Sequence, residues 1–132
     1  MHYKAKPLSP HITIYKPQIS SVLSITHRIT GVINFIGMSI LVWWVILIGA
    51  YGFIPDNTFM WQFFQSYIGI FCLMGWSFSL LLHMCTGIRH LFWDAGYGFG
   101  LAVFPKTGWL AIFCAGFFWI ILWTMIYIVR TP

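Results

Sequence analysis

The stretch HMCTGIRHLFWDAG, residues 83–96, begins inside a long apolar run and ends in charge. His83 is therefore predicted to lie within a lipid bilayer, whereas Arg89, His90 and Asp94 mark the point where the chain leaves it. Ionisable side chains inside a membrane are costly, and they commonly mark functional sites. His83 is therefore the first candidate for a functional residue.

The composition around that stretch excludes a soluble domain. Of the 132 residues, 60% are hydrophobic, 20% are aromatic and only 7% are charged. A bilayer span needs about 20 apolar residues, and three charge-free windows are long enough. We therefore predict an all-α membrane protein, with residues 20–132 forming a three-helix membrane domain. The three spans are expected at about 29–51, 63–92 and 107–129.

The second window, residues 57–88, contains 32 residues without a charge, which is longer than a bilayer requires. We therefore expect one tilted or projecting helix there, and Arg89 near its projecting end. The formal net charge of +5 does not indicate nucleic-acid binding, because the basic residues flank the apolar windows. They are expected at the level of the lipid headgroups.

Residues 1–19 are predicted to form an arm on the cytoplasmic or matrix side, because Pro7, Pro10 and Pro17 forbid a continuous helix. Arg130 and Asp56 fall on the opposite side of the three spans. Positive charge favours the inner side of a membrane, so the N-terminus is predicted inside. The basic residues on that side are Lys4, Lys6, Lys16, Arg28, Arg89 and Lys106.

The sequence shows no secretory signal and no transit peptide. This favours a multi-pass protein of a bacterial inner membrane, or of a mitochondrial inner membrane if the chain is organelle-encoded. Cys72, Cys85 and Cys114 lie within the spans without a CxxC pair, so we expect packing residues rather than a disulfide or zinc site. Ser20 or Ser21 is expected to cap the first helix.

His83 lies about 9 Å deeper than Arg89 by helical rise, where an imidazole needs a partner. A heme iron is one possible partner, because neutral imidazole is a common metal ligand and Gly87, one turn along, leaves room for a flat macrocycle. A hydrogen bond to a neighbouring helix is the alternative. His90 lies about 10 Å further out, and His27 is placed at the start of the first helix. A bis-histidine heme would therefore need a ligand from another chain.

A second constellation lies at the start of the first helix. Ser24, His27 and Arg28 have i, i+3 and i+4 spacing, which places a hydroxyl, an imidazole and a guanidinium on one sector of the helix. A polar head with carbonyl oxygens could bind there. The alternative is that Arg28 only reaches lipid headgroups or pairs with Asp94.

Three segments, KPLSPHITIYKP (6–17), SVLSITHRITG (21–31) and HMCTGIRHLFWDAG (83–96), resemble in order and spacing those of the cytochrome b556 subunits of succinate dehydrogenase. These subunits are the larger membrane anchors of respiratory complex II. The resemblance covers nearly the whole chain. It departs at Lys6, where the family usually has arginine, and at Thr26, where an aliphatic residue is common.

The resemblance implies that the chain is an anchor subunit of succinate:ubiquinone oxidoreductase, within a heme-binding bundle shared with a second, smaller anchor. His83 would be an axial ligand of one heme b, and the smaller anchor would supply the other ligand. Ser24 and Arg28 would line the ubiquinone site near the iron–sulfur subunit, with His27 and His90 close to heme propionates. The flavoprotein subunit would hold the dehydrogenase active site.

In this reading, Arg28 stabilises the negative charge that develops on a quinone oxygen, and Ser24 donates a hydrogen bond to it. Asp94 is expected to be a charge partner of Arg28 or Arg89, or part of the quinone site. A purely structural anchor without a cofactor is the alternative function. A transporter is disfavoured, because the polar groups gather at one surface, whereas a transport pathway needs them through the bilayer.

Overall fold

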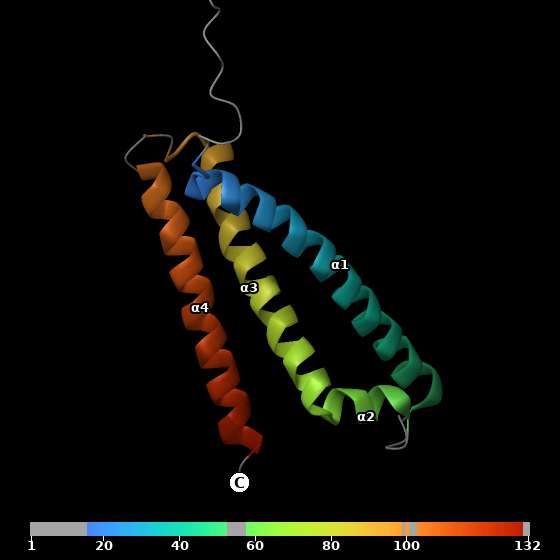
Figure 1. Cartoon of the computed structure of the whole chain (residues 1–132). Coiled ribbons are helices and arrows are strands. Elements are labelled where there is room, and N and C mark those ends of the chain that lie inside the picture. The colour runs from blue at the N-terminus through green and yellow to red at the C-terminus, as the bar shows by residue number, and fades with distance from the viewer. Residues whose placement is uncertain (1–15, 53–57, 99, 101–102, 131–132) are drawn as a thin grey trace, which may run out of the picture.

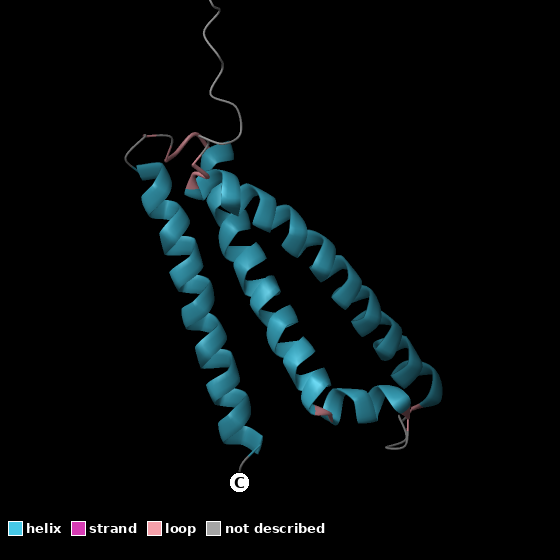
Figure 2. Cartoon of the chain, in the orientation of Figure 1, coloured by secondary structure: helices cyan, strands magenta, loops and turns pink. Residues whose placement is uncertain are grey.

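The computed structural model describes residues 16–52, 58–98, 100 and 103–130, and within them the secondary structure consists of helices joined by loops (Figure 2). The predicted arm at residues 1–19 falls almost entirely outside this part of the chain, as do Pro55, Asp56 and Asn57. The helices are α1 (Ile19–Tyr51), α2 (Phe59–Gln65), α3 (Tyr67–Asp94) and α4 (Val103–Arg130).

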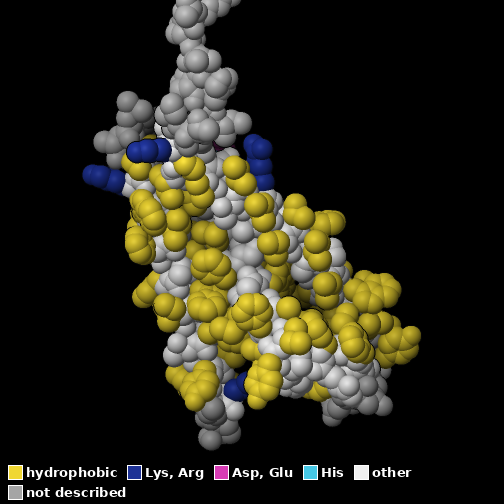
Figure 3. Space-filling model, in the orientation of Figure 1, with side chains coloured by type: hydrophobic (Ala, Val, Ile, Leu, Met, Phe, Trp, Pro, Cys, Tyr) yellow, Lys and Arg dark blue, Asp and Glu magenta, His cyan; other side chains and the backbone are white. Residues whose placement is uncertain are grey.

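Helices α1, α3 and α4 are each long and apolar enough to cross a membrane. Figure 1 shows α3 between the other two, with α4 running beside it and α1 diverging from it below their shared upper end. The prediction of an all-α protein with three long apolar helices is therefore confirmed. Many large apolar side chains are exposed in the isolated chain, and they cover the face seen in Figure 3. Such a surface is suited to lipid or to partner helices.

Helix α1 begins directly after an extended residue, Gln18, and its first helical residue is Ile19. The expectation that Ser20 or Ser21 caps this helix is therefore wrong, because both serines already lie within its first turn. The helix ends at Gly52, whose φ of 68° is readily adopted only by glycine and whose N–H donates to Ile48 O at 2.8 Å.

The second apolar window does not form the single long helix that its length predicts. It is divided at Ser66, which follows α2 and caps α3 by accepting a hydrogen bond from the Gly69 amide at 3.1 Å. A Cβ on Gly69 would collide with the carbonyl oxygen of Phe63. Glycine at this position therefore allows α2 to fold across the first turn of α3, where it forms a bridge toward the far end of α1 (Figure 1).

Small residues on α4 allow that helix to approach its neighbours closely. Gly108, Ala111 and Ala115 are buried on one face of α4, and Ala115 has no exposed surface. Further along, the Trp119 indole donates to Met74 O and the Trp123 indole donates to Ser77 Oγ, both at 3.0 Å. Near one end, Gly108 lets α4 approach Leu23 of α1 closely, and toward the other end the indole hydrogen bonds join α4 to α3.

Candidate functional site

Polar side chains connect α1 to α3 where the two helices lie close together. His27 Nδ1 lies 2.7 Å from Thr86 Oγ1, Thr30 Oγ1 lies 3.1 Å from His83 Nδ1, and Ser79 Oγ donates to Asn34 Oδ1 at 3.0 Å. On each helix the partners are three or four residues apart, which places them on one face. Four of these side chains are buried: Thr30, Asn34, Ser79 and Thr86. We call these six residues the polar seam.

The hydrogen bonds of the polar seam fix the tautomer of His83. Its Nδ1 lies 3.1 Å from the carbonyl oxygen of His27, which can only accept, so Nδ1 must carry the proton. The Thr30 hydroxyl can donate its own proton to Thr26 O or His27 O, each at 2.9 Å, and can therefore accept from His83. The Nε2 atom of His83 keeps its lone pair, as a metal-binding imidazole requires.

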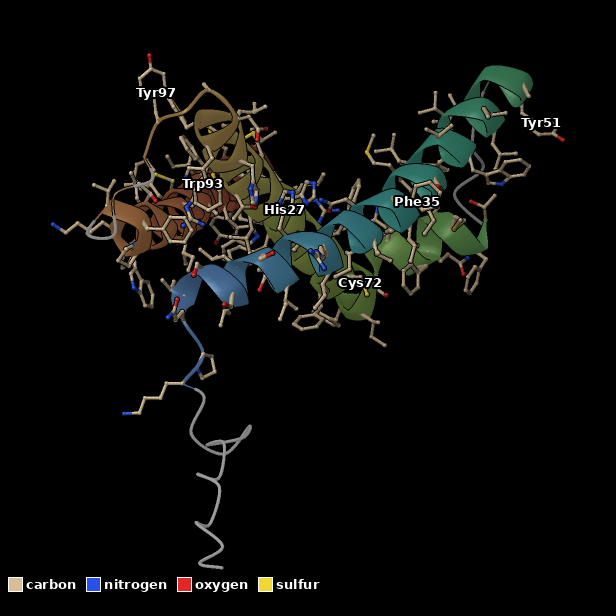
Figure 4. The ribbon with its side chains drawn as sticks, turned by 90° about the horizontal axis from the view of Figure 1, so that it is seen from above. His27, Phe35, Tyr51, Cys72, Trp93 and Tyr97 are labelled. Atoms are coloured by element: carbon tan, nitrogen blue, oxygen red, sulfur yellow. The ribbon has the colours of Figure 1, made fainter. Side chains whose placement is uncertain are left out.

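His27 lies against His83 rather than outside the bundle. The two rings are stacked, with centroids 3.9 Å apart and planes inclined by 5°, and Figure 4 shows His27 where α1 crosses α3. The prediction that His83 has no histidine of this chain at its depth is therefore wrong. The reason is that α1 starts at Ile19, which places His27 more than two helical turns inside the helix.

Two glycines make room for these rings. A Cβ on Gly31 would lie 3.2 Å from His83 Cε1, and a Cβ on Gly87 would lie 3.7 Å from His27 Cε1. The space beside Gly87, predicted to accommodate a macrocycle, thus adjoins the His27 ring. No three His, Cys, Asp or Glu side chains in the described part of the chain gather around a metal position. The described residues therefore do not form a metal site of three or more such ligands.

A surface cleft of about 430 Å³ lies beside the polar seam, among the ends of α1, α3 and α4. It brings together three of the predicted site residues: Ser24 and Arg28 of α1, and His90, which is far from them in the sequence. The His90 ring lies 5.1 Å from the His27 ring, so the cleft and the polar seam adjoin. We call it the polar cleft; it is lined by Ser20, Ser21, Ser24, Ile25, Arg28, Arg89, His90, Trp93 and Phe104.

Asp94 does not pair with Arg28 or Arg89 among the described residues, and its side chain is exposed. The predicted charge pair is therefore wrong. Arg89 turns instead toward α4, where it donates to Thr107 Oγ1 at 3.1 Å and to Phe104 O at 2.9 Å. It is only 7% exposed, although the sequence placed it at a surface. Spacing along one helix could not reveal this contact, because both partners belong to another helix.

The three cysteines are free thiols. Cys85 and Cys114 line an apolar cavity of about 450 Å³ between α3 and α4, together with Leu110 and Phe118. Cys72 lines a second apolar cavity, also of about 450 Å³, between α1, α2 and α3. Cys85 and Cys114 are thus half-buried among apolar side chains, whereas Cys72 is exposed, and the packing role stays a prediction.

Comparison with known proteins places the chain among membrane subunits. A family model described as "Succinate dehydrogenase/Fumarate reductase transmembrane subunit" matches residues 3–125. The succinate dehydrogenase cytochrome b556 subunit of Rickettsia prowazekii (strain Madrid E) is 50% identical over 121 residues, covering 92% of this chain and 93% of that protein. The succinate dehydrogenase cytochrome b560 subunit of Marchantia polymorpha is 37% identical over 121 residues, covering 85% of this chain and 84% of that protein. The b556 subunit of Paracoccus denitrificans is 35% identical over 97 residues, covering 70% of each.

Proposed function

Because the chain belongs to the family of succinate dehydrogenase and fumarate reductase transmembrane subunits, we propose that it anchors a succinate:ubiquinone oxidoreductase, binds heme b and helps form the ubiquinone-reduction site. It is a membrane subunit of an oxidoreductase complex. The succinate-oxidising active site belongs, in this proposal, to the flavoprotein subunit, and electrons reach the membrane through the iron–sulfur subunit. The observation that carries the proposal is the polar cleft, whose His90 ring lies 5.1 Å from the His27 ring that is stacked on His83.

His83 is the residue of this chain proposed to hold the heme iron. Its Nδ1–H is engaged by His27 O and Thr30 Oγ1, which orients the ring and leaves the Nε2 lone pair for a metal. The relatives are named as cytochrome b556 and cytochrome b560 subunits, which agrees with a heme. A heme bound at His83 would supply a one-electron redox centre beside the polar cleft.

A second protein ligand of the heme would come, in this proposal, from a smaller anchor subunit. His27 is not suited to this role, because its ring is stacked on the His83 ring. An imidazole binds a metal through a lone pair in the plane of its ring, so two stacked rings cannot point at one iron between them. His27 and His90, whose rings lie 5.1 Å apart, are proposed to lie near the heme propionates.

The polar cleft is proposed to hold the ubiquinone head. Ser24 and Arg28 line it from α1, and aromatic side chains line it from α3 and α4. Such a cleft offers hydrogen-bond donors to the carbonyl oxygens of a quinone and apolar faces to its ring. When ubiquinone takes up two electrons and two protons to form ubiquinol, Arg28 would stabilise the charge on one oxygen and Ser24 would donate a hydrogen bond.

The proposed orientation places this cleft on the cytoplasmic side of a bacterial inner membrane, or on the matrix side in a mitochondrion. Lys16 precedes α1 and Lys106 lies in the first turns of α4, at the same end of the bundle as the cleft. Arg130 lies at the opposite end. More basic residues on one side favour the inner side of the membrane, where the iron–sulfur and flavoprotein subunits would bind.

Arg28→Ala in the assembled complex tests the quinone site. We expect ubiquinone reduction to fall by about 100-fold, because a charged hydrogen-bond donor is lost at the reacting oxygen. Succinate oxidation with an artificial acceptor should be unchanged, since it does not require the membrane site. Arg130→Ala is the matched control and should leave both rates as they are. Ubiquinone reduction at the parent rate in Arg28→Ala would refute the quinone site.

A purely structural anchor is the alternative, and one observation favours it: no three His, Cys, Asp or Glu side chains of the described residues gather around a metal position. A reduced-minus-oxidised spectrum of the purified complex separates the two functions. The heme proposal predicts a b-type signal that disappears in His83→Ala and persists in the control Arg130→Ala, at the opposite end of the bundle. No such signal in the parent complex would favour the structural anchor.

A further inference from the structure

Arg89 makes a set of contacts that ties α3 to the first turns of α4. Its Nε donates to Thr107 Oγ1 at 3.1 Å and its Nη2 donates to Phe104 O at 2.9 Å, while Thr107 Oγ1 donates to the same carbonyl at 3.0 Å. The side chain is only 7% exposed. A lysine could not reproduce this arrangement, because the two bonds use different nitrogens of a planar guanidinium.

The same guanidinium lies against two aromatic rings. Its central carbon is 4.0 Å from the Trp93 ring centroid and 4.9 Å from the Phe104 ring centroid. Trp93 and Phe104 are stacked on each other, with centroids 4.6 Å apart and planes inclined by 5°, and His90 meets Trp93 edge-on at 5.0 Å. Together with Arg89, these three rings form the side of the polar cleft contributed by α3 and α4, and we call the three rings the aromatic wall.

The helices would not need a charge here if packing were the only requirement. A cation next to the first turn of α4 lies at the positive end of the helix dipole, which is unfavourable. Among the described residues no carboxylate pairs with Arg89, so its charge is buried without a counter-charge. Burial of an unpaired charge is costly, and an apolar residue would pack between the helices at less cost. This cost indicates that Arg89 has a role beyond packing.

We propose that Arg89 is a positioning residue for the quinone: it holds Trp93 and Phe104 in one plane-parallel stack, so that the aromatic wall faces Ser24 and Arg28 across the polar cleft. This inference rests on the proposed function. Arg89 acts by positioning the aromatic wall, which binds the quinone ring. It does not act on the quinone oxygens that react. The wall contacts the substrate and the transition state equally, so its loss raises KM and leaves kcat unchanged.

The test compares variants of the assembled complex with short-chain ubiquinone as the acceptor. Arg89→Lys keeps the charge but loses the paired bonds and the stacking geometry, and should raise KM about tenfold with kcat within about twofold. Thr107→Val removes one of the two anchors and should raise KM about threefold. Trp93→Leu removes part of the wall itself and should resemble Arg89→Lys. Arg130→Lys, at the other end of the bundle, is the matched control.

A merely structural role predicts a different result: less assembled complex, with the parent KM in whatever assembles. Unchanged KM in Thr107→Val and Trp93→Leu would overturn the inference, even if Arg89→Lys fails to assemble. If Arg28→Ala lowers ubiquinone reduction while these variants keep the parent KM, only the inference fails. If the Arg28→Ala complex also reduces ubiquinone at the parent rate, both the inference and the proposed function fail.

Discussion

The imidazole rings of His27 and His83 lie face to face, 3.9 Å apart, although one belongs to α1 and the other to α3. Each Nδ1 is directed to a threonine hydroxyl on the opposite helix. The two histidines therefore serve as packing groups between the helices and still keep one ring nitrogen each for another partner. In this way one pair of side chains supports both the helix crossing and the candidate site.

Thr30→Val should weaken the contact between α1 and α3. The substitution preserves the shape of the side chain but removes the hydroxyl that meets His83 Nδ1, and we expect a loss of about 1 kcal/mol of unfolding free energy. Thr26→Val is the control, because the Thr26 hydroxyl donates only to Val22 O on its own helix. Denaturation in detergent micelles would measure both variants. If Thr30→Val and Thr26→Val were equally stable, the contact between Thr30 and His83 would not contribute to stability as proposed.

Gly69→Ala should break the corner between α2 and α3. Its Cβ would collide with the carbonyl oxygen of Phe63, which is backbone and cannot turn aside. We expect a loss of about 2–3 kcal/mol by overpacking. Gly75→Ala, where no atom lies within 4 Å of the new Cβ, should instead gain about 0.5–1 kcal/mol. Thermal unfolding followed by circular dichroism would show whether Gly69→Ala lowers the stability and Gly75→Ala raises it.

Asn34 and Ser79 should show a modest coupling energy. Their hydrogen bond is 3.0 Å long, and both side chains are buried between α1 and α3. Hydrogen bonds between membrane helices contribute about 0.6 kcal/mol on average. A double-mutant cycle with Asn34→Ala and Ser79→Ala should yield a value of that order. Simple additivity of the two substitutions would mean that the bond contributes nothing to stability.

Ala115→Leu should force α4 away from its neighbours. Ala115 has no exposed surface, so a larger side chain has no space there without a shift of the helix. We expect a loss of about 1–3 kcal/mol. Ile120→Leu is a suitable control, because Ile120 is 60% exposed and leucine has the same volume. A stable Ala115→Leu variant would show that the spacing of the helices is not set by this residue.

The number and character of the long helices follow from hydropathy alone, because a bilayer requires long uninterrupted apolar segments. The break at Ser66 does not follow from hydropathy, since the apolar run continues through it. Only the contact between Gly69 and Phe63 shows how α2 can turn. The grouping of Ser24 and Arg28 was likewise predictable from helical spacing. That Ser24 and Arg28 lie close to His90 could not be predicted from helical spacing, and it needs the resemblance or the structure.

Two errors in the sequence-based prediction have a common cause. The prediction starts the first span at Ile29 because Arg28 is charged, and this places His27 too far out. It places Arg89 at a surface for the same reason. Both predictions use a charge as the boundary of the buried region, but Arg89 is buried because Thr107 and Phe104 accept its hydrogen bonds. Sequence patterns within one helix cannot supply such partners.

The polar seam also determines the axial register of the bundle. Apolar helix faces allow sliding, because one leucine-sized contact resembles the next. The pairs of the seam match only in one alignment, and a slip of one turn, about 5.4 Å, would break all of them together. Ser24 and Arg28 lie within a turn of His27 on the same rigid helix, so the seam sets the height of the polar cleft above His83. The polar seam thus fixes the distance along the bundle between His83 and the residues of the polar cleft.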